Sequence, residues 1–251
     1  MTPASTLPLS ISAAGGPTIP DFGHASKCVS DNGTFCWDWF AQNWHSRVDF
    51  QARLIEHVEL TVIAVVIGFA IAFVLAVLAH RAQWIVAPVT FVGSLLYTIP
   101  SVAAFEILVT ITGINDVTVE IALVSYTLLI LFTNTLAGLS AVSADVVDAA
   151  RGTGLTDTQI LLRVELPLAV PTIIAGLRVA VVTIISLATV AALIVPEGLG
   201  KPIFDALGAG VFNTKFIASG VLCILLALLA DALFVGVQRA LTPWASARRT
   251  R

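Results

Sequence analysis

The chain has 251 residues, of which 57% are hydrophobic and 12% are charged, and its mean hydropathy is +0.95. Soluble domains carry about 25% charged residues, so this composition excludes an ordinary soluble domain and indicates an integral membrane protein. The net charge of −3 identifies no partner. No basic cluster of the kind that binds nucleic acid is present, so a nucleic-acid partner is not expected.

Residues 1–34 are rich in Pro, Gly, Ser and Thr and are expected to form a loosely ordered tail outside the cytoplasm. Neither a positive charge nor a sustained apolar core precedes Lys27, so the segment does not have the pattern of a secretory signal peptide. Cys28 and Cys36 enclose a short loop. Outside the cytoplasm they can form a disulfide, and two free thiols are the alternative.

Residues 35–55 are predicted to contain an amphipathic helix that lies at the membrane interface. Apolar residues follow helical spacing on one face: Trp37, Phe40, Ala41, Trp44 and Val48. Tryptophan at headgroup depth is the common case in such helices. An aromatic cage for a quaternary amine is the alternative interpretation of the same residues.

Residues 56–240 contain five apolar runs, each long enough to cross a hydrocarbon core that needs about 20 residues. The runs are His57 to Ala79, Trp84 to Ile111, Val117 to Leu139, Leu168 to Val195, and Lys215 to Val237. The predicted fold class is therefore an all-α integral membrane protein with five transmembrane helices.

An odd number of spans places the two termini on opposite sides of the membrane. Seven Lys and Arg residues fall on the side of the C-terminal tail, residues 241–251, and five fall on the other side. The positive-inside rule thus favours a cytoplasmic C-terminus with a basic tail, and an N-terminus outside.

The second run contains Tyr97, Thr98, Pro100 and Ser101. Pro100 is expected to kink the span and free a backbone carbonyl, which nearby hydroxyl groups can satisfy. The segment either lines a polar path or is a simple structural kink. Glu106, near the outer end of this run, is expected to face that path or a partner subunit.

A polar segment separates the third and fourth runs. Its distinctive residues are small, acidic or turn-forming, or mark its end: Asp148, Ala149, Ala150, Gly152, Gly154, Leu166 and Pro167. Gly154 allows a positive φ between two short helices, and Thr156 is placed to cap the second helix, Asp157 to Val164. Pro167 is expected to mark a break before the next membrane helix. An ordinary loop with a capped helix is the alternative.

Three polar side chains lie deeper in the later runs. Arg178 and Asp231 fall at comparable depths, so they are expected to pair or to face a common vestibule; the alternative is that Arg178 extends to the headgroups. Asn134 is expected to form an interhelical hydrogen bond, and Cys223 to be a small packing residue.

No pattern in the sequence supports catalysis. Gly200-Lys201 is followed by Pro202, so the chain lacks a phosphate-binding loop, and its His and Cys residues show no metal-ligand spacing. We therefore expect no enzyme activity, no catalytic residue, no metal and no cofactor in this chain. If ATP and Mg²⁺ drive it, a separate ATPase subunit binds them.

The segment of residues 143–167 resembles the EAA loop of bacterial ABC importer permeases, with Asp148 in place of Glu and Val164 in place of Ile. Three further stretches are similar to permeases of the osmoprotectant subfamily: LLYTIPSVAAFEIL, SYTLLILFTNTLAGL and IIAGLRVAVVTIISLATVAALIVPEGLG. The similarity runs from about residue 37 to 240. Residues 195–197, Val-Pro-Glu, replace the small residues that this subfamily has before its GLG sequence.

The resemblance implies a type I ABC importer permease in a bacterial cell membrane. It further implies ATPase subunits that dock on the EAA loop, a second permease subunit that is identical or paralogous, an external binding protein, and a substrate such as glycine betaine, choline, carnitine or proline betaine. Three other classes remain open: a permease for amino acids or another small solute, a transporter or channel without an ATPase, and a membrane scaffold protein.

Overall fold

The computed structural model describes residues 26–208 and 210–243, and these fold as helices and connecting segments without a β-strand. The predicted N-terminal and C-terminal tails fall largely outside the described residues. The helices are α1 (Lys27–Ser30), α2 (Trp37–Gln42), α3 (Phe50–Arg81), η1 (Gln83–Ile85), α4 (Val86–Thr98), α5 (Ser101–Thr112), α6 (Asp116–Ser140), α7 (Ala144–Gly152), α8 (Asp157–Ile160), η2 (Leu161–Glu165), α9 (Leu166–Ala191), α10 (Gly200–Gly208) and α11 (Asn213–Leu241).

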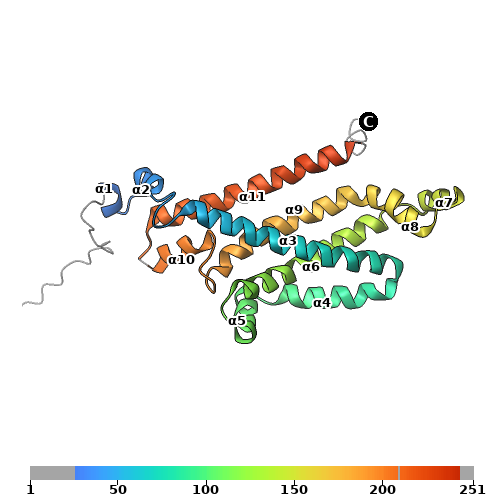
Figure 1. Ribbon diagram of the computed structural model, residues 1–251, viewed down its shortest axis with the longest axis horizontal. Coiled ribbons are helices and arrows are strands. Elements are labelled where there is room, and N and C mark those ends of the chain that lie inside the picture. The colour runs from blue at the N-terminus through green and yellow to red at the C-terminus, as the bar shows by residue number, and fades with distance from the viewer. Residues whose placement is uncertain (1–25, 209, 244–251) are drawn as a thin grey trace, which may run out of the picture.

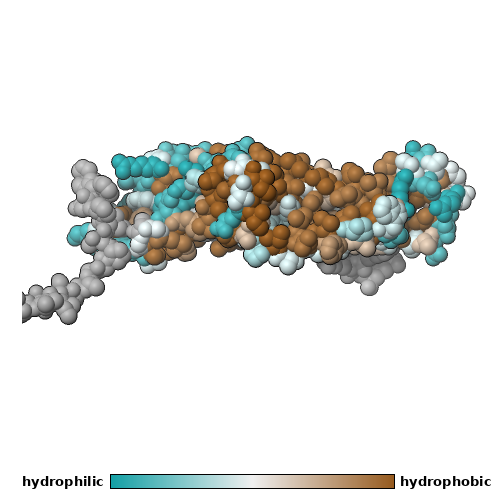
Figure 2. Space-filling view, turned by 90° about the horizontal axis from the view of Figure 1, so that it is seen from below, coloured by the Kyte–Doolittle hydropathy of each residue, from teal (hydrophilic) through white to brown (hydrophobic). Residues whose placement is uncertain are grey.

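Four of the described helices are long and apolar enough to cross a membrane: α3, α6, α11 and the continuous helix Asp157–Ala191 that ends with α9. The number becomes five when the bent pair Gln83–Thr98 and Ser101–Thr112 is taken as one span. The long helices run along the long axis of the molecule, with α2 and α10 near one end and α7 and α8 at the other (Figure 1). On the face shown in Figure 2, apolar residues cover the middle and hydrophilic residues gather toward the ends. The predicted fold class is confirmed.

The helix α6 is central to the bundle and packs against both α3 and α9. Leu60, Leu123 and Ile184 contribute one buried side chain from each of these three helices to the largest core cluster. Asn134 of α6 packs over Gly176 of α9, where an added Cβ would lie 2.5 Å from the Cβ of Asn134. The prediction of an interhelical hydrogen bond for Asn134 is wrong, because its amide donates to the Ile130 carbonyl one turn earlier, at 2.8 Å.

The second span is broken at Pro100. The prediction of a kink understates the change, since α4 and α5 meet at 98°. Ile99 and Pro100 both have extended backbone angles, as expected for a proline and the residue before it. The freed Ile99 carbonyl accepts a hydrogen bond from the Tyr126 hydroxyl of α6. The hydroxyl groups expected to serve it lie elsewhere, and that of Thr98 donates to Ser94 within α4 at 2.7 Å.

The predicted amphipathic helix is shorter than its apolar spacing suggested. It covers Trp37–Gln42 only, and the chain then bends until Asp49, whose φ is 49° and whose side chain caps α3. Residues 50–55 therefore belong to the first span. Trp44 lies beyond the helix, but its ring contacts that of Phe40, with centroids 5.5 Å apart. An aromatic cluster at one end of the bundle thus replaces the expected continuous stripe.

Replacing Tyr126 with Phe tests the anchor of the bend. The substitution removes the hydroxyl bond and leaves the Ile99 carbonyl unpaired, so we expect the free energy of unfolding to fall by about 1–3 kcal/mol. Thermal unfolding in detergent measures it. Tyr97→Phe is the matched control, because its ring packs on that of Tyr126 at 6.0 Å but its hydroxyl makes no hydrogen bond to the described residues. Equal stability of both variants would contradict the assignment.

Candidate coupling segment and substrate path

Residues 143–167, the coupling segment, project at the end of the molecule away from α10 (Figure 1). The helix α7 has no buried residue and packs mainly against α8 and η2 among the described elements. Asp148 and Ala149 are exposed, and Ala150 is partly buried. A short helix with small side chains and an open face is a surface on which another protein can pack closely.

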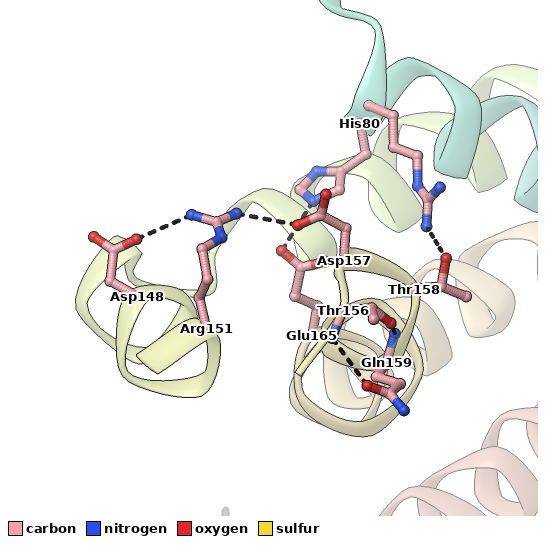
Figure 3. Close-up of polar contacts among 9 residues, drawn as sticks. His80, Asp148, Arg151, Thr156, Asp157, Thr158, Gln159 and Glu165 are labelled. Carbon is pink, nitrogen blue, oxygen red and sulfur yellow. Dashed lines mark hydrogen bonds and ion pairs between the residues drawn. The ribbon is translucent and has the colours of Figure 1, made fainter. Parts of the chain in front are cut away.

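The turn between α7 and α8 has the predicted local structure. Gly154 has φ +87°, which an L-residue rarely adopts. Thr156 and Gln159 form a capping box, in which each side chain bonds the backbone N–H of the other residue. Arg151 bridges the two helices, since its guanidinium lies 3.3 Å from Asp148 and 3.2 Å from Asp157 (Figure 3). These exposed ion pairs orient α7 more than they stabilise it.

The prediction of a break at Pro167 is wrong. The helix continues from Asp157 to Ala191, and it widens to a π-turn over Leu161–Glu165, immediately before Leu166 and Pro167. A wider turn accommodates the proline ring and the missing donor without ending the helix. The second helix of the coupling segment and the fourth span are therefore one continuous element.

The coupling segment is also bonded to the end of α3. The His80 Nε2 atom lies 3.2 Å from the Glu165 carboxylate, and the Arg81 guanidinium lies 3.4 Å from the Thr158 hydroxyl (Figure 3). Sequence reasoning treated His80 and Arg81 only as flanking charges. The sequence showed a carboxylate, Glu165, at the start of an apolar run. Nothing in the sequence indicated that this carboxylate is buried or which distant residue it contacts.

The predicted path residues lie on and around the bend between α4 and α5. Tyr97, Thr98, Pro100 and Glu106 are exposed, and Ser101 is partly buried. Within the described residues, the Glu106 carboxylate has no ion-pair or hydrogen-bond partner. Most of these side chains therefore lie on the surface of this chain.

The structure brings Arg178 of α9 and Asp231 of α11 together. Arg178 Nε lies 2.8 Å from one carboxylate oxygen and Nη2 lies 3.0 Å from the other, a bidentate pair that is about one-third exposed. Near the same end, the Gln238 amide donates to the Pro171 carbonyl at 3.2 Å. The most hydrophobic stretch of α11 has no buried residue. These two polar contacts therefore help to hold α11 against α9.

At the opposite end, the start of α3 holds the turn before α10. The Gly198 N–H donates to Glu56 at 2.9 Å, and the Leu199 N–H donates to His57 Nδ1 at 3.3 Å. Because Nδ1 accepts, Nε2 carries the proton and donates to the Ile185 carbonyl at 3.0 Å. The shape of the loop with the unexpected residues 195–197 is thus set by side chains of the first span.

The N-terminal loop is fastened to the same end. Cys28 and Cys36 are joined by a disulfide. Asn32, inside the loop, donates to the Val211 carbonyl at 2.8 Å and accepts from the Asn213 N–H at 3.0 Å. The disulfide loop therefore covers the turn between α10 and α11.

Cys223 is partly buried and its thiol lies 3.5 Å from the Thr189 hydroxyl. Across residues 26–208 and 210–243, no group of His, Cys, Asp or Glu side chains could hold a metal ion.

The family of binding-protein-dependent transport system inner membrane components matches residues 64–246. This chain belongs to that family. The choline transport permease OpuBB of Bacillus subtilis is 31% identical over 75% of this chain and 86% of its own length. The osmoprotectant import permease OsmW of Salmonella typhimurium is 34% identical over 75% of this chain and 89% of its own length.

The fold matches the inward-facing MetNI methionine ABC transporter with a TM-score of 0.69 at 19% identity, over 76% of this chain and 95% of that one. The protein therefore has the type I ABC importer permease fold. The resemblance found in the sequence is confirmed.

Alanine replacements at Arg178 and Asp231, made singly and together, test the intramembrane pair. Each single change leaves a charge without its partner, so we expect a coupling energy of about 1–3 kcal/mol in the double-mutant cycle. Unfolding in detergent measures it, and Arg163→Ala, at an exposed position, is the control. Additive effects would show that the bidentate contact contributes nothing to stability.

Glu197, in the turn after α9, gives a pH-dependent prediction. Burial and the nearby Asp116 carboxylate raise the pKa of Glu197, and Arg53 opposes the rise only in part. The folded protein therefore binds this proton more tightly than the unfolded chain, and stability falls as pH rises through the raised pKa. Glu197→Gln should melt higher than the parent by about 1 °C near pH 8. The difference should vanish near pH 4, while Asp38→Asn, at an exposed position, should show no such trend.

Proposed function

We propose that this chain is the transmembrane subunit of an ATP-driven importer of compatible solutes that carry a quaternary ammonium group, such as glycine betaine, choline, carnitine or proline betaine. The observation that carries the proposal is the exposed coupling segment, whose residue spacing and local geometry suit a docking helix, in a chain of this family. The substrate class rests on the relatives, whose names state choline and osmoprotectant transport. The similarity to this chain covers most of the length of each relative.

The assembly in this proposal has two permease subunits, two ATPase subunits and an external binding protein. Asp148, Ala149, Ala150, Gly152 and Gly154 contact the ATPase, which binds ATP and Mg²⁺. The lysine and arginine bias supports a cytoplasmic coupling segment and C-terminus, with the disulfide loop and α10 outside.

Movement of the ATPases reaches the membrane through the continuous helix Asp157–Ala191. Because no loop interrupts this helix, a push on α7 and α8 is transmitted directly to α9. Leu166 and Pro167 lie inside this element and shape the π-turn instead of ending it. The Arg178–Asp231 pair carries α11 along with α9.

The path runs beside the bend of the second span. Tyr97, Thr98, Pro100, Ser101 and Glu106 are its proposed lining. The exposed ring of Tyr97, which packs on the buried ring of Tyr126, supplies aromatic surface, and the Glu106 carboxylate of α5 supplies negative charge; both attract a quaternary ammonium group. A second permease subunit completes the enclosure.

The proposed function is tested by reconstituting the chain with its ATPase and binding protein in liposomes. ATP hydrolysis and solute uptake are measured with glycine betaine, choline, carnitine and proline. Stimulation by the quaternary amines is expected. Stimulation only by another solute would leave a permease and refute the substrate class, and absence of any ATPase association would refute the function itself.

Gly154→Ala is the sharpest test of the coupling segment. An added Cβ meets no atom within 4 Å, so the change acts only through the positive φ, which costs an L-residue about 1–2 kcal/mol. We expect solute-stimulated ATP hydrolysis to fall several-fold. Gly236→Ala is the matched control, because an added Cβ there also meets no atom and its φ is not in the left-handed region. Equal losses in both variants would refute the role of the turn.

A further inference from the structure

The contact between His80 and Glu165 joins two elements that are far apart in the sequence. His80 is the penultimate residue of α3, and Glu165 closes the π-turn between α8 and α9. Their side chains are only 20% and 12% exposed. A bond shielded to this degree competes with less water than the exposed Arg151 pairs do, so it holds its two elements together more firmly.

The position of Glu165 gives this contact mechanical significance. It lies in the one π-turn of the described residues, where the hydrogen-bond pattern of the helix Asp157–Ala191 changes. A π-turn is one of the few places at which a helix kinks. A side-chain bond from outside the helix at this point restrains the weak turn, and it also connects that turn to α3.

The other end of α3 is bonded to the turn that follows α9. There, Glu56 and His57 accept the backbone N–H groups of Gly198 and Leu199 in the turn that follows α9. The helix α3 has 32 residues, or about 48 Å at 1.5 Å per residue. It is therefore attached to the α9 chain segment at both ends and packed against α9 between them.

We propose that His80 and Glu165 are positioning residues that make α3 and α9 move as one body when the coupling segment moves. The inference rests on the proposed function. Displacement of α7 and α8 is then transmitted along two helices, and α3 delivers it to the turn that precedes α10. Without the contact, the π-turn absorbs part of the displacement, so that ATP is hydrolysed with less solute moved.

The test measures solute uptake per ATP hydrolysed in liposomes that contain the complete complex. For His80→Ala, Glu165→Ala and the double variant, we expect this ratio to fall about three- to ten-fold. The double variant should be no worse than the worse single variant, because one bond is lost in each case. The KM for ATP and the amount of bound ATPase should be unchanged. His45→Ala, at an exposed position on the opposite end, is the control and should keep the parent ratio.

Conservative replacement separates positioning from packing. In His80→Gln the side-chain amide can still donate to Glu165, so the ratio of uptake to hydrolysis should stay within about two-fold of the parent. His80→Leu keeps the side-chain volume but cannot donate, so its ratio should fall as far as that of His80→Ala. These variants also decide the matter if Glu165→Ala does not assemble. A parent-like ratio in His80→Leu, failure of His80→Gln to preserve the ratio, or additive losses in the double variant would overturn the inference. If the parent complex itself shows no uptake, the proposed function fails, which is a different result from these.

Discussion

A backbone inside a membrane has no water to bond, so each N–H and C=O group must find a partner within the protein. The long helices satisfy this requirement along their own axes, and every departure from a regular helix then needs a specific partner. The break at Pro100 is tolerated because the Tyr126 hydroxyl takes the Ile99 carbonyl. The proline at position 167 is tolerated differently, because the helix widens to a π-turn instead of breaking. The two prolines therefore have opposite structural results.

The same requirement decides where polar side chains lie. Within the spans, Arg178 and Asp231 bind each other in a bidentate pair, and buried His57 uses both ring nitrogens on backbone groups. Each of these contacts crosses from one helix to another or to a turn. Polar groups in an apolar bundle thus act as fixed points between helices.

Contacts between distant segments consequently lie at both ends of the bundle. At one end the coupling segment is exposed and joined to α9 by an unbroken helix, with a side contact to α3 through His80 and Glu165. At the other end, α3 holds the turn before α10, and the disulfide loop holds the turn after it. In the proposed function, these restraints convert a local push on the coupling segment into displacement of whole helices, which is the kind of change that alternating access requires.

The amino-acid sequence by itself determined the membrane class and the all-α fold, the family, and the local structure around Gly154 and Thr156, because these follow from apolar run length, from residue pattern and from interactions within a few residues. Only the tertiary structure decided the rest. The spacing of Trp37 to Val48 suggested one helix, but the helix ends at Gln42 and the chain bends until Asp49 caps α3. The partners of Ile99, Glu165 and Gly198 come from helices tens of residues away, and composition and periodicity contain no information about which distant side chain meets a given backbone group. The comparable depth of Arg178 and Asp231 had left their pairing open as one of three alternatives, and the structure selects it. Within a bilayer, distance from the surface restricts which residues can meet.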